Sequence, residues 1–323
     1  MIGLWTVAGY LALNLLAAAV TGVWYRRWCR SVAWSPQGLM PSAEPIDVGT
    51  GETAILFVHG FNDVPYVWRR LIDALSQRGC RCRAMRLPGA GERDCRPTLA
   101  SLRAAVDDEL RALRKTNRRV VLVGHSMGGA LALDAVFRVE AANRPDRLVL
   151  LAPLVEVSRA RSPVLSARGW YLVLRALLPA LRWVPSVFKE YLHAEDDETF
   201  VYRRDRFNEI GWYRALFALV KTLRSADKSR LQVPTLVVTA GDDRVVDSAA
   251  TTRFFTGLPG VELREIPGAS HVLPLNGAVL AEWKAANLSE TDIPMSDHDV
   301  KIDWLTDCEM GKSVNQAIRQ SVQ

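Results

Sequence analysis

The sequence predicts an α/β fold in which a mostly parallel, doubly wound sheet is covered by helices. The first observation is a series of short, continuous apolar runs, which are typical of strands buried on both faces of a parallel sheet. The second is that segments with apolar residues at helical spacing alternate with these runs. The chain has 323 residues, of which 49% are apolar, so it can bury a sizeable core.

Residues 1–25 contain no charged side chain and are dominated by Leu, Ala, Val and Trp. As a helix, this segment is long enough to cross a hydrocarbon core of roughly 30 Å. Basic and aromatic residues gather at its C-terminal end: Arg26, Arg27, Arg30, Trp24, Tyr25 and Trp28. Because positive charges flank membrane spans on the cytoplasmic side, residues 1–30 predict a single-pass anchor that leaves the rest of the chain in the cytoplasm.

A cleavable signal peptide is the alternative for this segment, and cleavage would export the domain. Ala17, Ala18 and Ala19 offer the small residues of a cleavage site, but no basic residue precedes the apolar run. The five cysteines are odd in number and lack the paired spacing of zinc ligands, which is typical of reduced thiols in a reducing compartment. The anchored form is therefore the leading prediction.

The composition and the motifs also limit the kinds of partner and cofactor that the chain is expected to bind. The formal charge is +6, but the arginines recur on amphipathic segments without a nucleic-acid motif beside them. The glycines match no dinucleotide-binding or phosphate-binding loop. We therefore predict no nucleic-acid partner, no cofactor and no metal site.

The strands of the predicted sheet can be located one by one. They are residues 54–58, 82–87, 120–123, 148–151, 235–239 and 261–266. Residues 31–53, rich in Pro, Gly and Ser, predict a linker or an irregular lead-in strand before the first of them. Helices between the strands are marked by their ends: Gly79 closes one, Thr98 is a candidate N-cap of another, and Asp247 caps a third. Residues 54–153 and 232–284 thus form two parts of one core.

The interval at residues 154–231 has no strand-like run. A loop of that length without structure would be improbable, so it predicts an inserted helical unit. Two stretches have apolar residues at helical spacing, one beginning at Trp170 and one at Trp212. Because the insertion leaves from the C-terminal end of a strand, it should lie over the crevice where open α/β sheets bind ligands. We expect a lid that shapes an acyl pocket.

The run from Gly124 to Gly128 (Gly-His-Ser-Met-Gly) lies between an apolar strand and a helix-like stretch. A serine on so tight a turn needs neighbours without side chains, because the strand and helix backbones approach each other there. The amide of Met127 would then point toward an oxygen on the carbon that Ser126 attacks. This is the G-x-S-x-G arrangement of a hydrolase nucleophile, and an aspartate in place of Ser126 would instead have indicated a dehalogenase or an epoxide hydrolase.

Several motifs follow one another in a fixed order along residues 54–273. They are His59-Gly60-Phe61, Leu87-Pro88-Gly89-Ala90-Gly91, Gly124-His125-Ser126-Met127-Gly128-Gly129, Gly241-Asp242-Asp243-Arg244-Val245-Val246 and Ser270-His271. Together they resemble the α/β-hydrolase superfamily, and within it the carboxylesterase, monoacylglycerol lipase and lysophospholipase branch. The resemblance implies an α/β-hydrolase fold with a helical cap insertion. The N-terminal anchor and a polar tail at residues 285–323 lie outside it.

The nucleophile needs a base and an acid, which in this fold follow the serine in the order acid, then histidine. Of the five histidines, His271 alone follows a late strand on a loop, so it is the predicted base. Asp242 and Asp243 both follow the strand at 235–239, and the residues by themselves do not choose between them. The resemblance implies Asp243, because related enzymes carry the acid directly before the pair written here as Arg244-Val245.

The oxyanion hole is predicted to combine the amides of Met127 and Phe61, the latter from the loop after the first strand. The predicted function is that of a serine hydrolase acting on carboxylic esters of apolar or lipid-like substrates, close to the membrane that residues 1–25 cross. Two alternatives stay open. One is a thioesterase or another acyl-transfer hydrolase, and the other is a non-catalytic binding module on the same fold.

Overall fold

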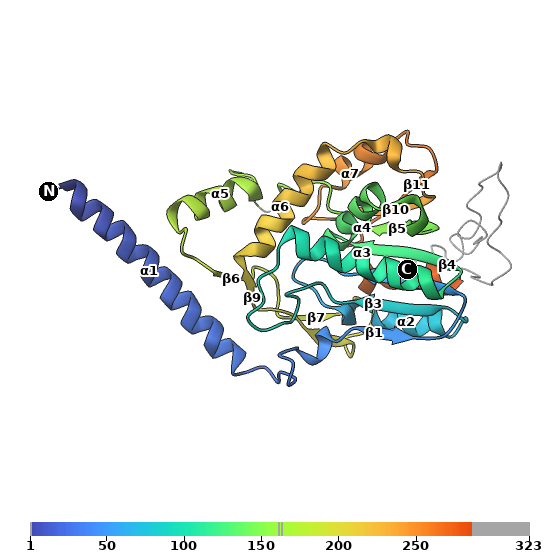
Figure 1. Ribbon diagram of the computed structural model, residues 1–323, viewed down its shortest axis with the longest axis horizontal. Coiled ribbons are helices and arrows are strands. Elements are labelled where there is room, and N and C mark those ends of the chain that lie inside the picture. The colour runs from blue at the N-terminus through green and yellow to red at the C-terminus, as the bar shows by residue number, and fades with distance from the viewer. Residues whose placement is uncertain (1, 161, 163, 286–323) are drawn as a thin grey trace, which may run out of the picture.

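The computed structural model describes residues 2–160, 162 and 164–285, and its centre is a seven-stranded sheet (Figure 1). The strand order is β1-β3-β2-β4-β5-β10-β11, and every neighbouring pair except β1 with β3 is parallel. The strands are β1 (Ile46–Val48), β2 (Thr53–Val58), β3 (Arg81–Met85), β4 (Arg119–His125), β5 (Arg147–Leu151), β10 (Thr235–Ala240) and β11 (Val261–Ile266). The predicted mostly parallel sheet is confirmed.

Helices cover both faces of the sheet, so that a hydrophobic core lies on each side. They are α2 (Arg69–Ser76), α3 (Leu99–Thr116), α4 (Met127–Arg138), α6 (Ile210–Arg224), α7 (Ser248–Phe255) and α8 (Gly277–Ala285). One core joins the sheet to α3, α4, α6 and α7, and the other joins it to α2 and α8. The predicted caps are present: the side chain of Thr98 accepts from the amide of Ser101, and that of Asp247 accepts from the amide of Ala250.

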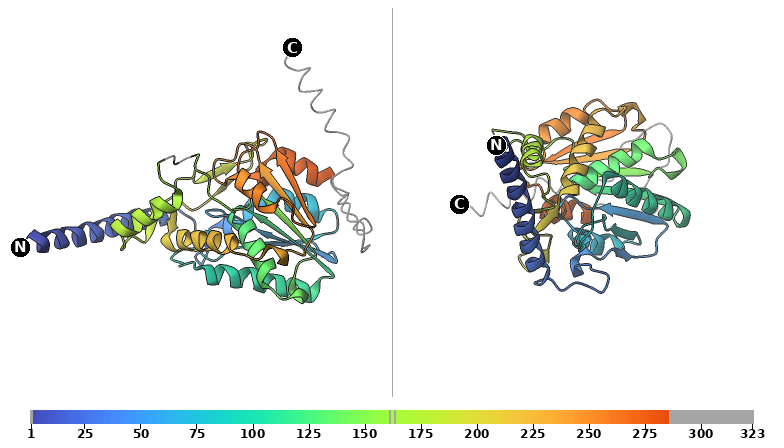
Figure 2. Two further views of the ribbon diagram at one scale, coloured as in Figure 1. Left: turned by 90° about the horizontal axis from the view of Figure 1, so that it is seen from above. Right: turned by 60° about the vertical axis from the view of Figure 1, so that its left-hand side comes forward.

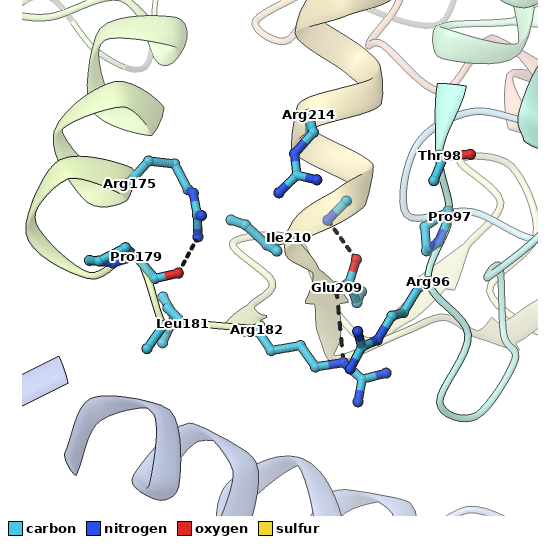
Figure 3. Close-up of a pocket in the computed structure, with 12 residues that line it drawn as sticks. Arg96, Pro97, Thr98, Arg175, Pro179, Leu181, Arg182, Glu209, Ile210 and Arg214 are labelled. Carbon is cyan, nitrogen blue, oxygen red and sulfur yellow. Dashed lines mark hydrogen bonds and ion pairs between the residues drawn. The ribbon is translucent and has the colours of Figure 1, made fainter. Parts of the chain in front are cut away.

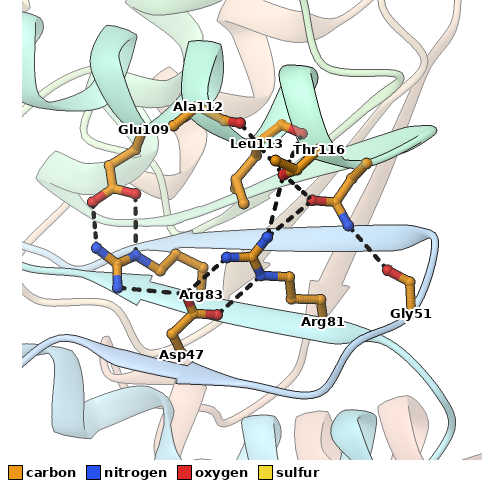
Figure 4. Close-up of polar contacts among 9 residues, drawn as sticks. Asp47, Gly51, Arg81, Arg83, Glu109, Ala112, Leu113 and Thr116 are labelled. Carbon is orange, nitrogen blue, oxygen red and sulfur yellow. Dashed lines mark hydrogen bonds and ion pairs between the residues drawn. The ribbon is translucent and has the colours of Figure 1, made fainter.

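The edge strand β1 comes from the segment that we predicted as a linker or lead-in strand. Polar contacts fasten it to the neighbouring elements (Figure 4). Asp47 of β1 accepts two hydrogen bonds from Arg81 of β3, whose guanidinium also donates to Thr116 at the end of α3. Arg83 pairs with Glu109 of α3 at 2.7 Å. Three residues are too short a run to show the alternation that predicts a strand from sequence.

The insertion at residues 154–231, here called the cap, differs from the all-helical unit that we predicted. It contains the helices α5 (Ala167–Leu177) and α6, but also two small antiparallel sheets. Their strands are β6 (Trp183–Pro185), β7 (Tyr191–His193), β8 (Val201–Arg203) and β9 (Phe207–Glu209). Each strand has three residues, which again is too short for a periodic signal, so the prediction of a purely helical cap was wrong.

The N-terminal helix α1 (Ile2–Cys29) projects from the domain, with α5 of the cap beside it (Figure 2). Residues Trp5–Cys29 have a mean hydropathy of 1.7, and by length and composition alone they form a candidate membrane span or signal sequence. Several contacts join α1 to the cap, including one near the middle of the helix and one near its C-terminal end. Asn14 donates to the carbonyl of Leu177 at 3.0 Å, and Tyr25 stacks on Trp183 with ring centroids 3.5 Å apart.

The remaining boundaries differ from prediction by a few residues. The predicted strand at 82–87 is observed at Arg81–Met85, and α2 begins one residue after Trp68, which lies in a 3₁₀ turn. Pro274 also lies in such a turn, shortly before α8, so it precedes that helix without interrupting it. From residue 286 onward, the predicted polar tail lies outside the described residues.

Candidate active site

Ser126 sits on a strained turn between β4 and α4, with φ of 54° and ψ of −120°. Such a backbone conformation costs a non-glycine residue about 1–3 kcal/mol, so the surrounding structure must enforce it. The two flanking glycines allow this. A Cβ atom on Gly124 would lie 2.6 Å from the carbonyl oxygen of Gly128, and one on Gly128 would lie 2.2 Å from that of Val58. Side chains at these positions would push the strand and the helix apart.

The structure brings Ser126, His271 and Asp243 into one chain of hydrogen bonds. The distance from His271 Nε2 to Ser126 Oγ is 2.9 Å, and that from His271 Nδ1 to Asp243 Oδ2 is 2.7 Å. Because a carboxylate can only accept, Nδ1 carries the imidazole hydrogen, and Nε2 is free to accept the hydroxyl hydrogen of Ser126. This is the tautomer in which histidine can act as a general base toward serine.

The carboxylate of Asp243 is fully covered, whereas Asp242 is exposed to solvent. Burial by itself would raise the pKa of Asp243, but hydrogen bonds from His271 and from the amides of Val245 and Val246 hold that pKa below its usual value. Asp243 is therefore an anion when its partner histidine becomes protonated. The structure thus places at the histidine the aspartate that the resemblance had implied.

Two further histidines support the site without touching Ser126 Oγ, and the sequence analysis gave neither of them a role. The distance from Nε2 of His125 to the carbonyl oxygen of His271 is 2.9 Å, so His125 donates a hydrogen bond to the backbone of His271. Burial lowers the pKa of His125 to about 3, which keeps its ring neutral. His59 accepts from the amide of Leu87 and donates to the carbonyl of Gly60, and burial lowers its pKa to about 4. Both rings fix loops that border Ser126.

The loop after β2 brings Phe61 to the nucleophile. A Cβ atom on Gly60 would lie only 3.1 Å from Cβ of Ser126, so the residue before Phe61 is packed against the serine. In the part of the chain that the structure describes, neither the amide of Phe61 nor that of Met127 has a hydrogen-bond acceptor. Met127 is the first residue of α4, so its amide also lies at the positive end of the helix dipole. Both predicted oxyanion donors thus border the serine with their amides unoccupied.

The cap holds this loop in place from the other side. The ring of Phe61 packs edge-on against Trp212 and Tyr213 of α6, with centroids 5.9 Å and 5.1 Å away. Tyr202 of β8 donates to Asp63 at 2.8 Å, and burial raises the pKa of Asp63 to about 6. Cap and oxyanion loop therefore form one packed unit. Asp63 lies two residues after the His59-Gly60-Phe61 motif, but no spacing in the sequence indicates its partner.

No group of three or more His, Cys, Asp or Glu residues in residues 2–160, 162 and 164–285 is arranged to hold a metal ion. What the site contains is a serine hydroxyl hydrogen-bonded to a histidine, a carboxylate that orients that histidine, and two amides without an acceptor among the described residues. This combination is suited to nucleophilic attack on a carbonyl carbon, with the negative charge that develops on oxygen received by the amides.

Comparison with known proteins places the chain in a family. Residues 55–283 match the alpha/beta hydrolase family, and the chain belongs to it. It is 24% identical to the phospholipase YtpA of Bacillus subtilis over 219 residues, which are 63% of this chain and 81% of that protein. It is also 38% identical to an epoxide hydrolase of Caballeronia sordidicola over 100 residues, which are 29% of this chain and 28% of that protein.

The solved structures agree on the fold. A soluble variant of monoglyceride lipase from Saccharomyces cerevisiae matches with a TM-score of 0.58 at 17% identity, over 74% of this chain and 87% of that one. The monoacylglycerol lipase of Paleococcus ferrophilus matches with a TM-score of 0.56 at 17% identity, over 75% of this chain and 95% of that one. The α/β-hydrolase resemblance stated from the motifs is confirmed, and two of the solved structures that share the fold are monoacylglycerol lipases.

Proposed function

We propose that this protein is a serine hydrolase that cleaves carboxylic esters of apolar or lipid-like substrates through an acyl-enzyme on Ser126. The observation that carries the proposal is the hydrogen-bonded chain from Asp243 through His271 to the serine hydroxyl. The family supports it, as do the names of the relatives, which include a phospholipase and monoacylglycerol lipases. The epoxide hydrolase relative matches over 100 residues, but a serine occupies the proposed nucleophile position here.

The geometry suggests how each group would act. As Ser126 Oγ bonds to the ester carbonyl carbon, His271 Nε2 takes the hydroxyl proton, and Asp243 stabilises the imidazolium that forms. The amides of Met127 and Phe61 would hold the oxyanion. When the tetrahedral intermediate collapses, the ester C–O bond breaks and His271 gives the proton to the leaving alcohol. Water then attacks the acyl-enzyme by the same route and releases the acid.

The membrane placement is a second part of the proposal. We infer that α1 spans the bilayer with its Arg26 end in the cytoplasm, and that α5 is partly immersed beside it. None of the residues of α5 is buried, and its apolar side chains are open to the surroundings, with Trp170 50% and Leu177 58% exposed. So much exposed apolar surface marks a site of contact with a membrane or a partner. The cap would then stand where amphiphilic esters are concentrated.

The polar contacts between α1 and α5 fit this placement. Asn14 is 4% exposed, and it binds Leu177 and Ala180 at the C-terminal end of α5. A polar side chain inside a membrane span faces a protein partner, because lipid offers none. Tyr10 adds a hydrogen bond to the carbonyl of Ala176 at 2.8 Å. These contacts make α1 part of the cap as well as an anchor, so the full chain is the form to assay.

A substrate panel tests the function. We expect the full chain, purified in a nonionic detergent, to hydrolyse p-nitrophenyl esters, and to prefer octanoate over acetate because the cap is apolar. Monoacylglycerol and lysophosphatidylcholine should also be cleaved, and acyl-thioesters more slowly. The Ser126→Ala variant is the matched control. Faster cleavage of thioesters would favour a thioesterase, and equal turnover by the Ser126→Ala variant would overturn the proposal.

Membrane extraction tests the placement. We expect the full chain to stay in the membrane fraction after carbonate treatment, and Edman or mass analysis to find its N-terminus intact, because residues 2–25 of α1 form an uncharged, mostly apolar stretch long enough to span the bilayer. Protease added outside intact cells should leave the hydrolase domain uncut. A processed chain recovered outside the cytoplasm would show that residues 1–25 act as a signal peptide. It would contradict the proposal that α1 anchors the domain in the membrane.

A further inference from the structure

A groove rich in arginine lies between the cap and the loop before α3, on the side of the cap that faces α1 (Figure 3). Its volume is about 460 Å³, within the range of small-molecule sites. The lining residues are Arg96, Pro97, Thr98, Arg175, Pro179, Ala180, Leu181, Arg182, Glu209, Ile210, Gly211 and Arg214. We refer to it as the arginine groove. Four guanidinium groups and a single carboxylate thus line one hollow.

The carboxylate does little to balance these charges. Glu209 is the N-cap of α6 and accepts from the amide of Gly211 at 2.6 Å. Its other oxygen lies 3.8 Å from Nε of Arg182, at the outer limit of an ion pair. In the part of the chain that the structure describes, that Nε is buried without a hydrogen-bond partner. The carboxylate therefore leaves most of the positive charge in the groove uncompensated.

The other arginines point into the groove from different elements (Figure 3). Arg175 comes from α5 and donates to the carbonyl of Pro179 at 2.9 Å, which leaves its remaining donors free. Arg214 comes from α6, and Arg96 comes from the loop before α3. Among the described residues, the side chains of Arg96 and Arg214 form no ion pair and no hydrogen bond. Guanidinium groups repel one another unless an anion lies between them.

Hydrogen bonds that involve α1 show which part of that helix lies beside each end of the arginine groove. At one end, Arg182 donates to the carbonyl of Asp94, whose amide in turn donates to the hydroxyl of Tyr25. At the other end, Ala180 donates to Asn14. Tyr25 lies eleven positions after Asn14 on the helix, a rise of about 16.5 Å. If α1 spans the bilayer as proposed, the Arg182 end stands at the depth of lipid headgroups and the Ala180 end among the acyl chains.

We propose that the arginine groove binds a phosphate-class anion, and that its physiological source is the headgroup of an anionic membrane lipid. Guanidinium groups recognise phosphate oxygens through paired, charge-assisted hydrogen bonds. The lipid's chains would lie along the exposed apolar face of α5. The N-terminal turn of α6 lines the groove with Ile210 and Arg214, and contacts Phe61 of the oxyanion loop through Trp212. An occupied groove would therefore fix the element that packs on the active site.

A binding experiment tests the site without relying on ester hydrolysis. The full chain, delipidated in a nonionic detergent, is titrated with fluorescent phosphatidylglycerol and, separately, with fluorescent phosphatidylcholine. We expect tighter binding of phosphatidylglycerol, weakened about tenfold or more in the Arg96→Gln/Arg214→Gln double variant, because each lost contact is a charge-assisted hydrogen bond. The Arg96→Lys/Arg214→Lys variant should retain part of the affinity.

A charge-matched control separates the groove from the overall charge of the protein. Arg118→Gln/Arg253→Gln removes the same charge from exposed positions away from the groove, and it should bind as the native chain does. Competition with inorganic phosphate and glycerol phosphate identifies the source: weak competition assigns the site to a lipid, whereas competition as strong as that of the lipid assigns it to a soluble phosphate compound. Equal loss of binding in both double variants, or in neither, would overturn the proposal.

Discussion

Replacing Ser126 with alanine is expected to lower kcat for ester hydrolysis by about 10⁶-fold, the size of effect found when the nucleophile of a serine hydrolase is removed. The reason is that Ser126 Oγ, 2.9 Å from His271 Nε2, is the only atom in the proposed mechanism that bonds to the substrate. The measurement is release of p-nitrophenol by the full chain at matched concentrations. Circular dichroism should show unchanged folding, because the β4 to α4 turn keeps both glycines.

A second serine provides the control for this result. Ser229→Ala alters an exposed hydroxyl in a 3₁₀ turn after α6, and should leave the rate unchanged. The His271→Ala variant should lose about as much activity as Ser126→Ala, and the double variant should lose little more, since the two residues act as a unit. If the fold-losses of activity in the two single variants multiplied in the double variant, the two residues would act independently.

The second large effect is expected at Asp243. The Asp243→Asn variant should fold but lose about 10⁴-fold in kcat, because an amide facing Nδ1 of His271 favours the wrong tautomer and gives no charge to stabilise the imidazolium. The Asp242→Asn variant is the matched control, with the same chemical change one residue away on an exposed side chain. It should retain nearly full activity. A reversal of the two effects would show that Asp242 holds the histidine in the working enzyme.

Much of the fold follows from local signals in the sequence. The strands of the parallel sheet are buried on both faces, so each appears as a continuous apolar run, and their order and spacing around Ser126 also indicate the family. Elements of three residues carry no such signal, which is why β1 could not be told from a linker and the four strands of the cap were missed. They are specified by pairing with distant segments, as with Ile46 against Ala84.

The candidate site likewise contains residues that local sequence signals predict and residues that they do not. Ser126 and His271 could be predicted from the sequence because Ser126 follows β4 directly and His271 lies on the loop after β11. The choice of Asp243 over Asp242 depends on which side chain turns inward, so it required either a family resemblance or a structure. Two supporting hydrogen bonds could not be predicted, namely that of His125 to the backbone of His271 and that of the Tyr202 hydroxyl to Asp63. Each joins residues more than a hundred positions apart, and local patterns in one sequence do not indicate such contacts.

The arginine groove could not have been predicted either, because its arginines come from three separate segments. Only the folding of the cap onto the loop before α3 brings Arg96 toward Arg182 and Arg214.

Covalent labelling tests the central claim most directly, namely that Ser126 is a nucleophile activated by His271. The full chain is incubated with a fluorophosphonate probe, digested and analysed by mass spectrometry, with the Ser126→Ala and His271→Ala variants treated in parallel. We expect one adduct, on the peptide that contains Ser126, absent from the Ser126→Ala variant and strongly slowed in the His271→Ala variant. A native, folded chain that takes up no probe, or carries it on a different residue, would contradict the assignment of this serine as the nucleophile.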